Sequence, residues 1–302
     1  MHIPEEIIER SRKFVEPYRI CSGKDFKLKN YPANDLGNLT KDHKDFMVAR
    51  LEQGVSFLEE LQSVLYASQT YALLVILQAM DAAGKDGLVK HVMGGINPQG
   101  CHVASFKQPT AQEYLHDYLW RCTKELPARG MIGIFNRSYY EEVLTAKVHP
   151  EGLLKEGYNP KDINKSFWDE RYENINHYEK HLYDCKTRFV KIFLHVSYDE
   201  QRKRLLDRLD TADKNWKFSQ GDIHEREYWD DYQDAFETMI QRTATKEAPW
   251  YVIPADNKWY ARIVGLCAVV NALADMKLEY PEVPKEIKEY FPKFRESLEK
   301  KK

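Results

Sequence analysis

Short apolar runs alternate with amphipathic stretches along most of the chain. Residues 71–77, Tyr-Ala-Leu-Leu-Val-Ile-Leu, form an uninterrupted apolar run whose length is typical of a buried strand. Four similar runs follow, at 101–106, 131–135, 189–196 and 250–254. Because helical patterns separate these runs, the order predicts an α/β fold in which a parallel sheet of about five strands is covered by helices on both faces.

The helical patterns have apolar residues at three- and four-residue steps. The clearest stripe predicts a helix from Thr40, as its N-cap, to about Tyr66; it consists of Met47, Leu51, Val55, Leu58, Leu61 and Leu65. Further helices are predicted after the first strand, over 110–126, from about 163 onward, over 222–246 and from the last strand to Met276. Residues 1–39 contain several helix breakers, such as Pro32 and Gly37, and predict an N-terminal arm that begins with a short helix.

A turn of small and charged residues follows the first predicted strand. It ends in Gly84 and Lys85, and a helical pattern starts at once. This order is that of a phosphate-binding loop, in which backbone N–H groups and a helix N-terminus meet an anion. The usual pattern has glycine where this chain has Ala79 and Ser or Thr where it has Asp86, and Asp81 adds a second carboxylate. The loop therefore loses a hydroxyl ligand and gains two acidic groups suited to Mg²⁺.

The third predicted strand ends in another polar turn. Asn136 and Arg137 come directly after it, and Glu141 and Glu142 follow. Since ligands collect at the carboxyl ends of parallel strands, this turn and the loop should face one crevice. Two interpretations stay open: a ligand site, with Asn136 where P-loop folds carry an acid for Mg²⁺, or a polar helix start whose glutamates favour the helix dipole.

The bulk properties exclude several classes of protein. A formal net charge of −2 over 302 residues argues against a general nucleic-acid binder, so an anionic substrate would need a locally basic pocket. The five cysteines are odd in number and form no C-x-x-C pair, which indicates reduced thiols. The N-terminus has no apolar signal core, and no apolar run is long enough to span a bilayer. We therefore expect a cytoplasmic protein without a membrane partner.

The segment from about 200 to 232 has two interpretations. Arg202, Arg204 and Arg208, followed by Lys214 and Lys217, would suit a movable lid over phosphates. However, residues 199–234 contain eleven Asp and Glu and only seven Lys and Arg, which favours a solvated helical hairpin.

Seven blocks in the same order make the chain resemble the polyphosphate kinase 2 family from about residue 40 to about residue 275. They are AMDAAGKDG (79–87), GGINPQG (94–100), FKQPT (106–110), LPARG (126–130), IFNRSYYE (134–141), KNWKFS (214–219) and APWYVIPADNK (248–258). The family is similar to thymidylate kinases in fold. The resemblance thus implies a single P-loop kinase-like domain over 40–302, with the segment at 200–232 as its helical lid.

The resemblance also implies an activity. The family transfers phosphoryl groups reversibly and with Mg²⁺ between inorganic polyphosphate and nucleotides, here AMP to ADP and ADP to ATP. The commonest pattern has Asp at the position of Asn136 and Asn at the position of Glu141. The form in this chain resembles the class III subgroup, which is taken to phosphorylate both AMP and ADP.

The residues that match the family's blocks receive roles by the same resemblance. Lys85 is the principal cation at the reacting phosphates, Arg137 contacts the phosphoryl group in transfer, and Asp81 anchors Mg²⁺, with Mn²⁺ as the alternative metal. Either Glu141 supplies the negative charge that Asn136 lacks or the second metal contact is absent, and both residues are counted with the catalytic residues. Lys107 and Arg121 are candidates for the acceptor side. The expected phosphate-binding residues are Ala82, Ala83, Gly84, Asp86, Gly87, Lys90, Arg202, Arg208, Lys214 and Lys217.

Two other functions remain compatible with the residues: an ATP-dependent nucleoside monophosphate kinase and a non-catalytic protein that binds nucleotide or polyphosphate. The doubled carboxylate in the loop argues against the first, and the presence of Asp81, Lys85 and Arg137 together argues against the second. The expected partners are inorganic polyphosphate, adenine or other purine nucleotides, and further copies of the chain in a homo-oligomer, with no nucleic acid.

Overall fold

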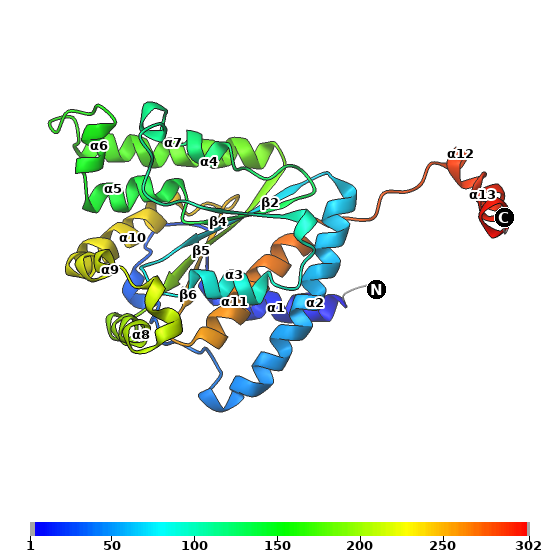
Figure 1. Ribbon diagram of the computed structural model, residues 1–302, viewed down its shortest axis with the longest axis horizontal. Coiled ribbons are helices and arrows are strands. Elements are labelled where there is room, and N and C mark those ends of the chain that lie inside the picture. Colours follow the sequence, from blue (N-terminus) through cyan, green and yellow to red (C-terminus); the bar gives the residue numbers. More distant parts are fainter. Residues whose placement is uncertain (1–3, 301–302) are drawn as a thin grey trace.

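A six-stranded sheet forms the centre of the computed structural model, which describes residues 4–300 (Figure 1). The strands are ordered β1-β6-β5-β2-β4-β3 across the sheet. They span Arg19–Ile20 (β1), Ala72–Gln78 (β2), Cys101–Ser105 (β3), Ile132–Asn136 (β4), Thr187–His195 (β5) and Trp250–Pro254 (β6). Strands β2 to β6 pair in parallel, and β1 pairs antiparallel with β6.

Strand β2 lies in the middle of the sheet because its apolar run can be buried on both faces. All seven of its residues are buried. Leu73 is aligned with Ile132 on β4 and with Arg188 on β5. This position brings the turn that follows β2 to the centre of the edge formed by the carboxyl ends of the strands, where ligands of open α/β sheets bind.

Helices cover both faces of the sheet (Figure 1). Helix α11 packs on one face with α1, α2 and α3 around it; these span Lys258–Ala274, Glu5–Val15, Lys44–Ser68 and Lys85–Val92. The other face carries α4 (Trp120–Thr123), α5 (Thr145–Val148), α6 (Glu151–Lys155), α7 (Lys165–Asp184) and α10 (Trp229–Thr243). Short 3₁₀ turns complete the connections, at Glu16–Tyr18, Leu28–Asn30, Lys41–His43, Pro98–Gly100, Glu113–Leu115, Tyr139–Val143, Ala212–Lys217 and Arg226–Tyr228.

Two further pairs of helices lie outside these layers. Helices α8 (Tyr198–Asp210) and α9 (Gln220–Glu225) make up most of the segment predicted as a lid, while α12 (Lys285–Lys288) and α13 (Phe291–Glu299) extend away from the body near the C-terminus (Figure 1). Within residues 4–300, none of the helices has both the length and the apolar character that crossing a bilayer requires.

The parallel sheet with helices on both faces confirms the architecture predicted from the sequence, and the N-terminal segment adds a sixth strand. Helix α1 packs on α11, and Arg19 pairs with Tyr251 of β6. The Leu28 N–H donates to Glu237 Oε2 of α10 at 2.8 Å. Residues 4–39 are therefore packed along the edge of the sheet.

The continuous helix predicted over 110–126 is wrong. Thr110 and Glu113 do form a capping box, in which each backbone N–H donates to the other's side chain, at 2.7 and 3.2 Å. The 3₁₀ turn that they start ends at Leu115. Asp117 Oδ1 then accepts from Leu119 N at 3.0 Å and begins a new turn. A local side-chain acceptor thus competes successfully with helix propagation.

Candidate functional site

The loop between β2 and α3 has a backbone shaped to curl around an anion. Ala82 adopts φ 61° and Gly84 φ 118°, both in the left-handed region, and Gly84 is the N-cap of α3. A non-glycine residue in this region is strained, and such strain concentrates at ligand sites. The Lys85 ammonium folds back and donates to the carbonyl of Ala79 at 2.9 Å. The loop is therefore closed by its own lysine at the start of α3.

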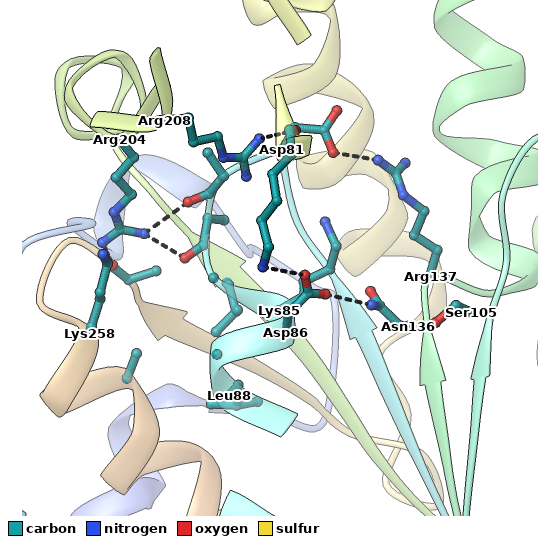
Figure 2. A pocket seen from close by; sticks show the side chains of 18 of the residues that line it. Asp81, Lys85, Asp86, Leu88, Ser105, Asn136, Arg137, Arg204, Arg208 and Lys258 are labelled. Atoms are coloured by element: carbon teal, nitrogen blue, oxygen red, sulfur yellow. Dashed lines mark hydrogen bonds and ion pairs between the residues drawn. The ribbon is translucent and has the colours of Figure 1, made fainter. Parts of the chain in front are cut away.

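A second strained residue completes the site from β4. Arg137 adopts φ 64° directly after the strand, and its N–H donates to Leu77 O of β2 at 3.0 Å. Its guanidinium bridges two carboxylates, Asp81 at 2.5 Å and Glu141 at 3.0 Å. Figure 2 shows the side chains of Arg137 and Asp81 joined by a dashed line. The two turns predicted to share one crevice are thus joined by the Arg137–Asp81 ion pair, while the Arg137–Glu141 pair lies within the second turn.

The charged groups of this cluster shift one another's pKa values. Burial and the neighbouring Arg137 lower the pKa of Lys85 to about 8. Burial alone would raise the pKa of Asp81, yet the charges of Lys85 and Arg137 hold that pKa below its usual value. Glu141 raises the pKa of Arg137, so the guanidinium stays protonated. A phosphate placed here meets one fixed cation and one cation that titrates near neutral pH.

The loop opens into a basic cavity of about 610 Å³, called here the first cavity. Nine Lys and Arg line it against three carboxylates, which are Asp81, Asp86 and Asp207. The cations come from α3, α8, α11 and the turns after β3, β4 and α8; they are Lys85, Lys107, Arg137, Arg204, Arg208, Lys214, Lys217, Lys258 and Arg262. This excess of positive charge inside a chain of net charge −2 supplies the locally basic pocket that the sequence requires.

A second cavity of about 640 Å³ meets the first at Asp81, Phe106, Lys107 and Arg137. Its lining is of a different kind, with aromatic rings and seven carboxylates against four Lys and Arg. The aromatic side chains are Phe106, Tyr114 and Tyr232, joined by His149 and His224. Asp81 and Arg137 therefore lie at the junction between a basic cavity and an acidic, partly aromatic one.

Helix α8 holds two arginines with different functions in the fold. Arg204 is buried and donates to four backbone carbonyls, those of Ala82 and Ala83 in the loop and of Ala255 and Asp256 after β6, at 2.6–3.2 Å (Figure 2). Arg208 lines the first cavity and pairs with Asp222 of α9 at 2.7 Å. The first arginine anchors the helix on the loop, and the second is the one placed to meet a ligand.

Most of the expected phosphate-binding residues line the first cavity, and two do not. Ala82, Ala83, Gly84, Asp86, Gly87, Arg208, Lys214 and Lys217 are all at its wall. Lys90 is exposed on α3, away from the cavity. Arg202 lines a separate depression that contains five carboxylates. Arg202 therefore does not face the loop as the resemblance implied, because it lies on a different side of α8 from Arg204 and Arg208.

The remaining candidates are held by specific contacts. Asn136 donates to Asp86 Oδ1 at 2.9 Å and so fixes that carboxylate at the start of α3 (Figure 2). Lys107 lines both cavities. Arg121 is buried and donates to the Lys107 carbonyl at 2.7 Å and to Glu142 at 3.3 Å. Arg121 therefore forms the floor of the second cavity and positions the backbone of Lys107.

Two cations of the first cavity, Lys258 and Arg262 of α11, were not among the site residues expected from the sequence. Arg262 lies over the loop, since its Nη2 is 3.8 Å from the position that a Cβ on Gly87 would take. Lys258 begins the helix that follows β6, at the same edge of the sheet as the loop. The rule that ligands bind at strand ends, applied to the last strand, would have found Lys258.

Oxygen ligands for Mg²⁺ are present at the junction. Asp81 and Glu141 flank Arg137, and Asp86 lies at the start of α3. Among the described residues, no group of three or more His, Cys, Asp and Glu is arranged to hold a metal by itself. Mg²⁺ is commonly bound by one or two carboxylates together with substrate phosphates and water, so Asp81 and Glu141 are a donor set that would suit it.

Comparisons with known proteins agree on one family. The family model described as Polyphosphate kinase 2 (PPK2) matches residues 41–281. The chain is 48% identical over 270 residues to an ADP-polyphosphate phosphotransferase of Rhodopseudomonas palustris, covering 89% of this chain and 92% of that one. It is 41% identical over 268 residues to an AMP/ADP-polyphosphate phosphotransferase of Meiothermus ruber, covering 89% and 96%.

A solved structure has the same architecture. The crystal structure of Polyphosphate Kinase 2 from Arthrobacter aurescens TC1 matches with a TM-score of 0.85 and 39% sequence identity, over 94% of this chain and 96% of that one.

Proposed function

Because the chain belongs to the polyphosphate kinase 2 family, it is a phosphotransferase acting between polyphosphate and nucleotides, and we propose that it phosphorylates both AMP and ADP with Mg²⁺. The family and the P-loop kinase-like fold predicted from the sequence are both confirmed. Asn136 and Glu141, the two positions that resemble class III, support the choice of both acceptors, as does the likeness to the Meiothermus ruber protein.

The observation that carries the proposal is the position of Asp81 and Arg137 where two unlike cavities meet, with Lys85 beside them in the first cavity. The first cavity suits a polyanion such as polyphosphate, since its cations outnumber its carboxylates. The second suits a nucleoside, because it offers aromatic surface and hydrogen-bonding groups beside the same junction. The phosphates of donor and acceptor would then meet at Arg137.

The transfer requires little covalent chemistry from the protein. A terminal phosphate oxygen of the nucleotide attacks the end phosphorus of polyphosphate, the new P–O bond forms as the anhydride bond breaks, and the shortened polyphosphate leaves. Lys85 and the loop N–H groups stabilise charge on the transferred group, and Arg137 contacts it from β4. Bound Mg²⁺ would be held by Asp81, with Glu141 near it, and would neutralise phosphate charge.

A donor and acceptor assay tests the proposal. With Mg²⁺ and polyphosphate, AMP should yield ADP and then ATP, and ADP should yield ATP. Removing the metal with a chelator should stop both reactions, and Mg²⁺ or Mn²⁺ should restore them. Asp81→Asn should lower kcat by about 10²–10³ because a charge at the reacting centre is lost.

Specific results would contradict each part. Turnover with ATP as donor but not with polyphosphate would indicate an ordinary nucleoside monophosphate kinase. Conversion of AMP that stops at ADP would remove ADP from the acceptors. Normal Mg²⁺ dependence in Asp81→Asn would show that Asp81 is not the metal ligand.

Two properties of the whole protein belong to the same proposal. A cytoplasmic location is supported by the absence of disulfides among the described residues, in which all five cysteines are free. A homo-oligomer is supported by large apolar side chains left exposed on α12, α13 and the turn between them, among them Ile287, Tyr290, Phe294 and Leu298. Sedimentation at several protein concentrations tests the oligomer.

A further inference from the structure

A second basic groove continues from the first cavity across the surface of α11. It has a volume of about 670 Å³ and shares Arg204, Asp207, Lys258 and Arg262 with the first cavity. Its far wall is formed by Lys41 in the 3₁₀ turn before α2 and Lys44 at the first turn of α2. We call this surface the α2–α11 groove.

The acidic groups of the α2–α11 groove are already neutralised or hydrogen-bonded within the fold. Glu200 pairs with Arg204 at 2.8 Å, and Asp207 pairs with Lys214 at 2.6 Å. The third carboxylate is Asp256, whose Oδ1 accepts the N–H of Ser197 at 2.8 Å.

Four of the six cations that line the groove have no such partner among the described residues, whereas Lys203 and Arg204 both pair with Glu200. Lys41, Lys44, Lys258 and Arg262 form no ion pair with any residue among those that the structure describes. Burial lowers the pKa of both Lys258 and Arg262, and repulsion from the nearby Arg204 lowers it further. An anion bound along the groove would relieve that repulsion.

The groove therefore matches a linear polyanion that enters the first cavity at one end and is too long to be contained there. We propose that the α2–α11 groove binds the distal part of a long polyphosphate chain, with Lys41 and Lys44 as the outermost contacts. This inference rests on the proposed function, because it assumes that polyphosphate occupies the first cavity. Chains that end inside the first cavity do not touch Lys41 or Lys44.

The test compares two chain lengths and two charge-matched variants. Lys41→Gln/Lys44→Gln removes two charges from the groove. Lys285→Gln/Lys288→Gln removes two exposed charges at the same three-residue spacing on α12, remote from both cavities. The KM of each is measured for long-chain polyphosphate and for tripolyphosphate at saturating nucleotide, after thermal melts have shown that both variants fold.

The groove variant should raise the KM for long-chain polyphosphate about tenfold, since two exposed charge contacts are lost. Its KM for tripolyphosphate should change less than twofold, and the difference between chain lengths should shrink at high ionic strength. The α12 variant should leave both KM values unchanged. The proposal would be overturned if the groove variant raised the KM for both chain lengths equally. It would also be overturned if the α12 variant raised the KM for long-chain polyphosphate as much as the groove variant does.

Failure of the groove and failure of the proposed function give different results. If the unmodified protein transfers no phosphoryl group from either chain, the proposed function is wrong. Calorimetric titration with long-chain polyphosphate, without nucleotide, then tests whether the α2–α11 groove binds polyphosphate, independently of any transfer reaction. Binding that is weakened about tenfold in the groove variant supports it, and binding that is absent or unchanged overturns it.

Discussion

Lys85 has a lowered pKa because its ammonium is enclosed by the loop that it closes. It donates to the Ala79 carbonyl at 2.9 Å, and burial with the nearby Arg137 lowers its pKa to about 8. Only the protonated form can stabilise a phosphate. The protein is therefore expected to lose its principal cation at a pH where an exposed lysine would still be fully charged.

This pKa predicts an alkaline limit to activity. The fraction of protonated Lys85 falls as the pH rises through about 8, so kcat/KM should decline above that value. Bound polyphosphate favours the charged form, so the decline in kcat should occur at higher pH than the decline in kcat/KM. Initial rates from about pH 6 to 10 measure both profiles.

The matched variant is Lys85→Arg, in which the cation does not titrate in this range. It should be slower, because guanidinium geometry differs, but its kcat/KM should no longer decline near pH 8. A decline at the same pH in both proteins would assign the titration to another group.

How far the sequence could predict the site depends on where each residue lies relative to a strand. Asp81, Lys85 and Arg137 follow β2 and β4 directly, and the structure brings them together as their spacing predicted. Arg262 lies inside α11, where its sequence context resembles that of any exposed helical arginine. Only the packing of α11 beside α3 places it over Gly87, and that packing is a property of the tertiary structure.

At the scale of the elements, α8 separates three arginines into three environments within seven residues. Arg204 holds four backbone carbonyls, Arg208 faces the first cavity, and Arg202 lies in the separate acidic depression. The charge count of the segment favoured a solvated hairpin and the family resemblance favoured a lid. The geometry gives a helix that is anchored at Arg204 and open to a ligand at Arg208.

Substitution of these arginines should give three different results. Arg204→Met should lower the free energy of unfolding by about 2–4 kcal/mol, because buried carbonyls lose their donors. Arg208→Ala should lower kcat and raise the KM for polyphosphate with little change in Tm, because this residue lines the first cavity and is not part of the core. Arg202→Ala should change neither quantity appreciably. Thermal melts and steady-state kinetics on all three variants measure these effects.

A loss of turnover in Arg202→Ala would contradict this assignment of the three arginines. If Arg202→Ala impairs turnover as strongly as Arg208→Ala, then α8 must rotate or shift when the substrate binds. The acidic depression would then not describe the position of Arg202 during catalysis.

The elements themselves were predictable where one periodicity dominates. The stripe from Met47 to Leu65 predicted α2, which spans Lys44–Ser68. The prediction over 110–126 failed because Asp117 offers a local acceptor, and that competition is decided by the tertiary packing of the segment. Strand β1 was not predicted because two residues carry no period, and only its pairing with β6 defines it.

At the scale of the whole molecule, a fully buried ion pair joins the sheet to its covering helices. Lys191 of β5 donates to Glu179 of α7 at 2.7 Å, to the Tyr140 hydroxyl at 2.8 Å and to the Thr243 carbonyl of α10 at 2.8 Å. The three N–H groups of the ammonium thereby donate to acceptors on three different segments of the chain. Such a pair stabilises the fold only while both partners are present, because either charge alone would be costly to bury.

Replacing one partner of the Lys191–Glu179 pair should therefore lower the free energy of unfolding more than replacing both. Lys191→Met should lower the free energy of unfolding by about 3–5 kcal/mol, as it leaves the Glu179 carboxylate buried without a cation. Lys191→Met/Glu179→Gln should recover part of that loss. The exposed pair Lys180–Asp184 on the same helix serves as the control, and Lys180→Ala should cost less than about 1 kcal/mol.

Urea denaturation of the four proteins gives these values. A double variant as unstable as Lys191→Met would show that the hydrogen bonds to Tyr140 and Thr243 matter more than the buried charge.

The pairing of β1 with β6 has a consequence for the order of events during biosynthesis. Arg19 is aligned with Tyr251, so β1 leaves the ribosome before its partner strand, which lies more than 200 residues later in the chain. Helix α1 is likewise synthesised before its packing partner, since it packs on α11, which follows β6. The N-terminal segment must therefore stay unpaired while β2 to β5 assemble, and it joins the sheet as one of the last steps of folding. Although α1 and β1 are synthesised before β2 to β6, they are thus among the last of these elements to reach their native positions.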